Sequence, residues 1–128
     1  PLLGIAQEVT LRSSVTEMAE DVDTRVVVIH GEGPYNLHAV EFTVTPTPGL
    51  EIVSVAGGDE VAPSRKSLDY DRDVVRIFGL GLEILTPGEW AIIALRRVPG
   101  ENILADWPET LIQITPGIAS SLDGDLPP

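Results

Sequence analysis

The chain has 128 residues, 43% of them hydrophobic, and this length and composition predict one folded domain spanning residues 1–128. Twenty acidic residues against eight basic ones give a formal charge of -12, which disfavours nucleic acid and anionic membrane surfaces as partners. No cysteine is present, so disulfides, thiol catalysis and thiolate metal sites are excluded.

Short segments rich in Val, Ile, Leu and Thr recur along the chain, and several alternate apolar with polar residues. Such composition and period-two alternation predict strands. Several strands of this length predict an all-β, antiparallel β-sandwich. No apolar run is long enough to span a membrane, so membrane insertion is not expected. In chain order, the predicted strands cover residues 5–11, 25–30, 39–45, 50–56, 73–78, 89–98 and 110–115.

The segment SSVTEMAEDVD lies between the first two predicted strands and contains many acidic residues. Ser14 precedes Glu17 by three residues, which is the spacing of a helix capping box. The segment nevertheless lacks a sustained apolar stripe at the helical period of 3.6 residues. We therefore predict an acidic loop here, with a single helical turn as the alternative.

The dipeptide Pro-Gly occurs four times and is the strongest turn signal in the chain. Proline presets φ for the first central residue of a turn, and glycine accepts a positive φ at the second, which suits a type II turn. Each dipeptide is therefore predicted to end an element, at residues 48–49, 87–88, 99–100 and 116–117.

Residue patterns that carry catalysis or bind zinc are missing from the sequence. It has no Gly-x-Ser-x-Gly turn, and its two histidines, His30 and His38, lie at the edges of predicted strands without a metal-ligand spacing. We therefore predict neither a catalytic histidine nor a zinc site. A pair of carboxylates for glycoside hydrolysis stays open, because twenty acidic residues are present and nothing singles out a pair.

The stretch LDYDRD resembles the start of a calcium-binding EF-hand loop, because Asp69, Asp71 and Asp73 occupy its first, third and fifth positions. Such a loop needs glycine at the sixth position and glutamate at the twelfth. Here those positions hold Val74 and Leu80. We therefore predict an acidic loop before a strand and no metal site.

The stretch NLHAVEFTVTPTPGLEIVSVAGGD joins an alternating strand, a Pro-containing turn and a second apolar strand, and in this order it resembles the third and fourth strands of cohesin modules. DVVRIFGLG and LTPGEWAIIALRRVPG are similar to later strands of that family. IASSLDGDLPP is similar to its closing strand, although Asp123 and Gly124 are adjacent here. The resemblance covers residues 24–127 and implies a nine-stranded jelly-roll sandwich of the cohesin type.

Cohesins bind dockerins, small calcium-loaded helical modules, on one flat sheet face. In that family the binding sheet includes the strands that match residues 37–45, 74–78 and 90–96 here. Strand parity, with Val40, Phe42 and Val44 inward on one strand and Ala91, Ile93 and Leu95 inward on another, then predicts the outward side chains. The predicted partner-binding residues are Leu37, Ala39, Glu41, Thr43, Arg76, Phe78, Trp90, Ile92, Ala94 and Arg96.

The outward row that begins at Trp90 is more apolar than a solvent-facing row usually is. An apolar row with a tryptophan and a flanking arginine has the composition of an interface core and rim. The alternative is that a loop or a terminal segment covers this row.

The resemblance implies that the chain is not an enzyme and has no catalytic residues and no cofactor. It implies a protein-protein interaction module whose dockerin-like partner binds the calcium. It also implies an extracellular or cell-surface location within a larger secreted protein, and the Pro-rich C-terminal end is expected to lead into a linker. Two other functions stay open: a carbohydrate-binding module, which needs coplanar exposed aromatic residues, and a structural spacer domain without a specific ligand. The partner's identity and the oligomeric state are left undetermined.

Overall fold

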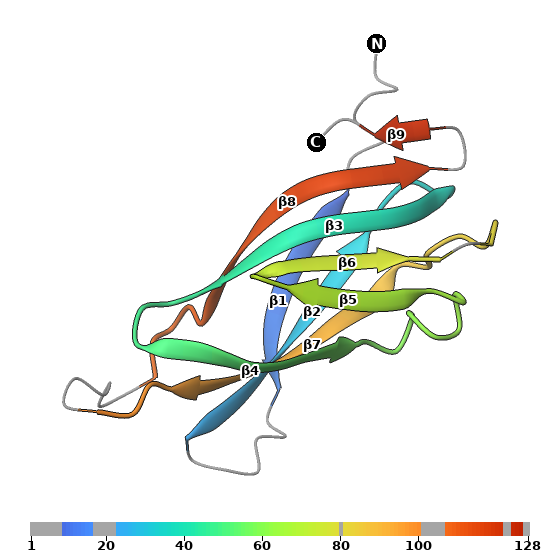
Figure 1. Cartoon of the computed structure of the whole chain (residues 1–128). Helices are drawn as coiled ribbons and strands as arrows, with labels where there is room; N and C mark the ends of the chain where they lie inside the picture. The colour runs from blue at the N-terminus through green and yellow to red at the C-terminus, as the bar shows by residue number, and fades with distance from the viewer. Residues whose placement is uncertain (1–8, 17–22, 80, 101–106, 122–123, 127–128) are drawn as a thin grey trace.

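Two antiparallel sheets pack face to face around an apolar core in the described part of the chain (Figure 1). The computed structural model describes residues 9–16, 23–79, 81–100, 107–121 and 124–126. These residues form strands and no helix, so the all-β antiparallel sandwich is confirmed. Within them, no helix is long and apolar enough to cross a membrane.

The described strands divide between a sheet of order β1-β2-β7-β4 and a sheet of order β5-β6-β3-β8, to which the three-residue strand β9 adds an edge. The chain therefore crosses repeatedly from one sheet to the other, as Figure 1 shows for β2, β3 and β4. The strand bounds are β1 Thr10–Thr16, β2 Thr24–Glu32, β3 Leu37–Pro46, β4 Leu50–Gly57, β5 Ser67–Asp71, β6 Val74–Phe78, β7 Gly88–Arg97, β8 Ile112–Ser121 and β9 Gly124–Leu126.

The core lies between the two sheets and receives side chains from both. Phe42 and Val44 of β3 are fully buried, and so are Ile93 and Leu95 of β7. Burying one such side chain contributes roughly 1.5–3 kcal/mol, so these alternating residues hold the sheets together. The wholly buried large side chains are Trp90, Phe42, Ile29, Leu37, Ile77, Leu85, Ile93, Leu95, Val27, Val44 and Val75.

The first described strand lies further along the chain than the sequence predicts. β1 includes residues 13–16, and Ser14 pairs with Val28 of β2, so the loop predicted for these residues and the capping-box alternative are both wrong. Ser, Val and Thr at its end are compatible with a strand, and β2 provides a long partner for them. Residues 5–8 of the predicted first strand, and Glu17, lie outside the described residues.

The predicted acidic loop around LDYDRD is instead a β-hairpin. Asp69 and Asp71 lie in β5, whose alternate residues Leu68 and Tyr70 pack against the core. The hairpin turns at residues 72–73, where Arg72 has φ 51° and the following aspartate φ 69°. Two consecutive positive φ values are typical of a type I′ turn. The acidic residues therefore decorate the solvent side of an amphipathic strand.

Two Pro-Gly dipeptides show opposite outcomes. Gly49 has φ 94°, and the backbone N–H of Leu50 donates to the carbonyl of Thr47 at 2.9 Å, which confirms the predicted turn. Pro116 and Gly117 instead lie inside β8, so the prediction that they end an element is wrong. They continue the strand because β8 is irregular at this point and pairs with β3 on both sides of it.

Candidate functional site

The ten predicted partner-binding residues lie on two different sheets. Those of β3 and β6 share the five-stranded sheet, whereas those of β7 belong to the sheet formed with β1, β2 and β4. The prediction of one common face is therefore wrong, because β7 pairs with β2 and β4 and not with β3 or β6. The four residues on the other sheet are Trp90, Ile92, Ala94 and Arg96.

Trp90 is fully buried, which contradicts its predicted outward position. Ile29 pairs with Ala91 while His30 pairs with Glu89, so Trp90 is an extra residue in β7. Such a β-bulge reverses the side-chain alternation locally. The indole N–H donates to the carbonyl oxygen of Thr86 at 2.8 Å, so the ring is a satisfied part of the core.

Glycine at position 31 makes room for this ring, because a Cβ there would overlap the Trp90 side chain. Beyond the bulge the predicted parity holds. Ile92 and Ala94 are half-buried, and Arg96 is exposed and forms an ion pair with Glu51 of β4.

Leu37 is also fully buried, which contradicts its predicted outward position. Leu37 pairs with Ser121 and Ala39 with Ser120, so His38 is an extra residue in β3. The bulge turns Leu37 toward the core and leaves Ala39 on the outer side. As in β7, one inserted residue makes the observed side-chain orientations differ from the predicted alternation.

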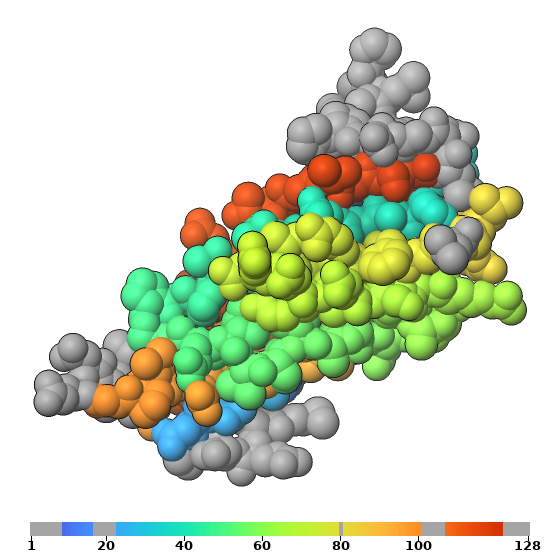
Figure 2. All heavy atoms as spheres, viewed as in Figure 1, coloured from blue at the N-terminus to red at the C-terminus, as the bar shows by residue number. Residues whose placement is uncertain are grey.

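The other predicted residues of β3 and β6 do share one surface. Register places their outward side chains in three rows across the sheet, and we call this surface the β3–β6 face. Figure 2 shows it as the near side of the molecule, with β8, β3, β6 and β5 side by side. The rows are Ser120, Ala39, Phe78 and Ser67; Glu41, Arg76 and Asp69; and Thr115, Thr43, Val74 and Asp71.

An ion-pair network occupies the middle row. Arg76 Nε lies 2.7 Å from Glu41 Oε1 on β3, and Arg76 Nη1 lies 3.8 Å from Asp69 Oδ2 on β5. The three side chains are partly exposed, so their mutual attraction contributes little to stability. Their effect is to hold the arginine across three strands in one orientation.

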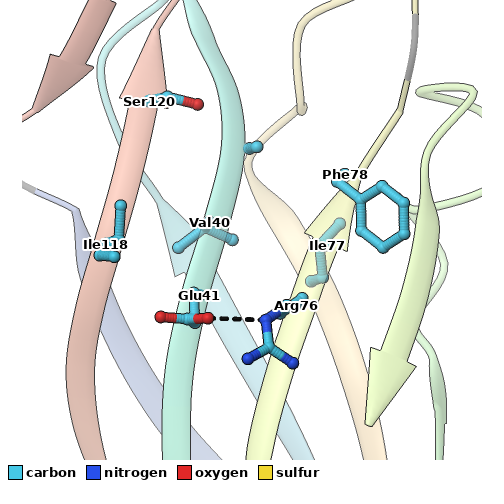
Figure 3. A pocket seen from close by; sticks show the side chains of 8 residues that line it. Val40, Glu41, Arg76, Ile77, Phe78, Ile118 and Ser120 are labelled. Atoms are coloured by element: carbon cyan, nitrogen blue, oxygen red, sulfur yellow. Dashed lines mark ion pairs between the residues drawn. The ribbon is translucent and has the colours of Figure 1, made fainter.

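A groove of about 200 Å³ lies beside this network (Figure 3). Phe78 of β6 and Ile118 of β8 stand on opposite sides of β3, with 45% and 62% of their surfaces exposed. Ala39 on β3 lies between them, and Ser120 follows Ile118 on β8; both side chains are short, so the surface is hollow there. The full lining is Ala39, Val40, Glu41, Arg76, Ile77, Phe78, Ile118 and Ser120.

Ile118 and Ser120 were missed by the sequence reasoning, because the predicted strand ended at residue 115. Val40 pairs with Ala119 and Phe42 with Pro116, so two residues of β8 stand opposite Glu41. These two are Gly117 and Ile118, and a Cβ on Gly117 would lie 2.8 Å from the backbone oxygen of Glu41. A glycine inside an apolar run is a signal of such a bulge.

The outer side of the other sheet has a hollow of about 250 Å³ that is lined by Thr10, Arg12, His30, Gly31, Glu32, Pro87 and Gly88. Ser14 Oγ and His30 Nε2 lie 2.9 Å apart near it. Within the described residues, no three His, Asp or Glu side chains gather closely enough to hold a metal ion.

His38, which precedes Ala39 on β3, contacts a buried lysine. Lys66 Nζ lies 3.1 Å from His38 Nδ1, and the lysine is 5% exposed. Burial lowers the pKa of Lys66, and the nearby Glu83 partly opposes this effect. On β5, burial raises the pKa of Tyr70, and the charge of Asp73 raises it further. Lys66 therefore links the segment before β5 to β3, and the Tyr70 hydroxyl donates to Asp73 Oδ1 at 3.3 Å in the hairpin turn.

No protein-family model and no curated protein match this sequence. Among solved structures, the fold is similar to that of a non-cellulosomal cohesin from the hyperthermophilic archaeon Archaeoglobus fulgidus, with a TM-score of 0.54. The two chains are 14% identical, and the match covers 82% of this chain and 73% of the cohesin. At this identity the similarity shows the fold, and the cohesin-like architecture inferred from the sequence is thereby confirmed.

Proposed function

We propose that this chain is a non-catalytic protein-protein interaction module that binds its partner on the β3–β6 face. One observation carries the proposal: Phe78 and Ile118 protrude on either side of a groove, while most outward neighbours on that face are polar or charged. A protruding apolar centre with a charged surround is typical of an interface.

The cohesin-like fold supports a more specific version of this function. In it, the sandwich is a nine-stranded jelly roll of the cohesin type, and the partner is a dockerin-like helical module that binds the calcium itself. The chain would then act outside the cell or at its surface, as part of a larger secreted protein. This chain would need neither a cofactor nor a metal of its own for that role.

Carbohydrate binding is less well supported by the described surface. A flat sugar-binding face needs coplanar exposed aromatic rings, but Phe78 is the one aromatic residue among the outward positions assigned to the β3–β6 face. Trp90 is buried, and Trp107 has the guanidinium of Arg25 over its ring at 4.8 Å. A spacer without a ligand is the outcome that the binding experiment below must exclude.

The proposal is tested by measuring the dissociation constants of dockerin-like modules from the source organism by titration calorimetry. The double variant Phe78→Ser/Ile118→Ser should weaken binding by at least about 30-fold, since one interface anchor is worth about 2 kcal/mol. The matched control is Val53→Ser/Ile92→Ser on the other sheet, which should bind like wild type. Thermal melts must show that both variants fold.

Equal affinities for wild type and the Phe78/Ile118 variant would overturn the proposed face. Weaker binding in the Val53/Ile92 variant alone would show that the interface lies on the other sheet. If no dockerin-like module binds the wild-type chain at all, the dockerin assignment is wrong and the spacer function is favoured.

A further inference from the structure

The groove on the β3–β6 face has room for one large side chain. Its lining includes Ala39 and the core residues Val40 and Ile77, and its volume is about 200 Å³. An apolar cavity of about 150 Å³ already admits benzene. The Glu41–Arg76 ion pair borders the groove (Figure 3), so the apolar part of the surface is limited to the size of one side chain.

The charges of this face favour a cationic partner. Among the outward side chains of the described rows, Glu41, Asp69 and Asp71 are acidic and Arg76 is basic, which gives a net charge of 1 - 3 = -2. Arg76 is engaged by Glu41 and Asp69, whereas Asp71 is exposed and forms no ion pair with any described residue. The formal charge of the whole chain, -12, acts in the same direction.

The spacing between groove and carboxylates suits a helix. Outward residues two apart on a strand are separated by about 7 Å and neighbouring strands by about 4.8 Å. Because β5 lies two strands from β3, Asp69 and Asp71 lie about 12 and about 17 Å from Ala39. On a helix, residues four and seven apart are separated by about 6 and about 10.5 Å along the axis. The long side chain of a lysine or arginine spans the remaining distance to Asp69 or Asp71.

We propose, building on the interaction function above, that the partner is a helix with one large apolar side chain and a lysine or arginine four or seven residues away. The apolar side chain fills the groove over Ala39, between Phe78 and Ile118, and the cation pairs with Asp69 or Asp71. The groove thus selects an anchor by size, and the acidic rows select the charge beside it.

The test is a selection from a phage-displayed library of a stable helix randomised on one face, followed by affinity measurements on the enriched sequences. These should share Leu, Ile, Met or Phe with Lys or Arg four or seven positions away. Ala39→Leu, which fills the groove, should weaken them by about tenfold or more. Asp71→Asn should weaken them by about threefold at low salt and by less at high salt. Ala56→Leu and Glu32→Gln on the other sheet are the matched controls.

Binders that require Phe78 and Ile118 but tolerate Ala39→Leu, or that lack the cation, would overturn this inference and leave the proposed function standing. Binders whose affinity is unchanged by Phe78→Ser/Ile118→Ser would contradict both the inference and the proposed function. An empty selection would overturn the inference alone, since the dockerin-like modules test the function separately. If the melting curve shows that Ala39→Leu misfolds, Ser120→Leu fills the same groove from β8.

Discussion

The outer faces of the two sheets both carry apolar side chains, but they differ in how these side chains are arranged and in whether a groove lies beside them. On the four-stranded sheet, Val28 is only 6% exposed and Ile92 and Ala94 are half-buried, and an exposed apolar side chain, Val53 at 54%, lies on the edge strand β4. On the five-stranded sheet, Phe78 and Ile118 are 45% and 62% exposed and stand beside a groove. Exposed apolar residues by themselves do not mark an interface, and the proposed interface therefore rests on two such side chains that stand beside a groove.

Bulges create this difference between the two faces. The extra residue in β7 turns Trp90 into the core and removes the tryptophan from the outer side of its sheet. The extra residue in β8, at Gly117 and Ile118, has the opposite effect and leaves an isoleucine standing on the β3–β6 face. The inserted residues in β7 and β8 therefore decide that Trp90 is buried and that Ile118 is exposed.

The largest expected effect tests whether Trp90 belongs to the core. Trp90→Ala should lower the free energy of unfolding by about 3–5 kcal/mol, because it empties a fully buried site and leaves the carbonyl of Thr86 without its donor. Urea denaturation measures the change, with Phe78→Ala as a control that should cost far less. A cost below about 1 kcal/mol, as for a surface residue, would show that Trp90 lies on the outer face and would contradict the difference described between the two sheets.

A smaller effect is expected at the bulge that lifts Ile118. Gly117→Ala should cost about 1–3 kcal/mol, because the new methyl group would lie 2.8 Å from the backbone oxygen of Glu41 and the strands would have to shift. The methyl resonance of Ile118 should move with it. Ser120→Ala on the same strand is the control. Unchanged stability with an unmoved Ile118 resonance would show that the bulge is not tightly packed.

The ion-pair network should matter less for stability than for orientation. Glu41→Gln should change the free energy of unfolding by less than about 1 kcal/mol, because both partners are partly exposed. The change should shrink further in high salt. A loss of several kcal/mol in urea denaturation would instead make the middle row a structural element of the sheet.

The smallest effect concerns pH. Because burial lowers the folded-state pKa of Lys66 below the ordinary 10.5, the unfolded chain holds more protons between these two values. The stability contributed by this residue therefore rises as the pH rises through that window. The difference in free energy of unfolding between wild type and Lys66→Met should shift in favour of wild type as the pH rises toward 10.5. A difference that stays constant with pH would contradict the lowered pKa.

The titration of Tyr70 does not affect the difference in stability between wild type and Lys66→Met. Its pKa is raised in the folded chain, so its own contribution to stability falls as the pH rises above the ordinary value of 10.0. Wild type and the Lys66 variant share this tyrosine, and the loss cancels in their difference.

Much of the fold was predictable because alternation and turn chemistry act locally. The predicted strands at 25–30, 39–45, 50–56 and 89–98 coincide with β2, β3, β4 and β7, and Gly49 turns the chain as predicted. β5 was missed because its acidic residues read as a loop, although Leu68 and Tyr70 alternate with them toward the core. Here tertiary packing outweighs the low strand propensity of aspartate.

The candidate site was predictable only in part. Ala39, Glu41, Thr43, Arg76 and Phe78 lie on one face, as parity and the resemblance together implied. The remaining predicted positions were misplaced or assigned to the wrong sheet, because a bulge reverses parity and sheet pairing is a long-range property. Period-two reasoning has no means of locating an inserted residue, and this is why Trp90 and Leu37 were wrong.

The most direct test of the account is to map the binding surface by NMR, with a dockerin-like module titrated into isotope-labelled chain. We expect the signals of Ala39, Phe78 and Ile118 to shift or broaden in a saturable manner while those of Ile92 and Ala94 stay unchanged. Perturbations confined to Ile92 and Ala94 would place recognition on the four-stranded sheet and contradict the central claim that the β3–β6 face binds the partner.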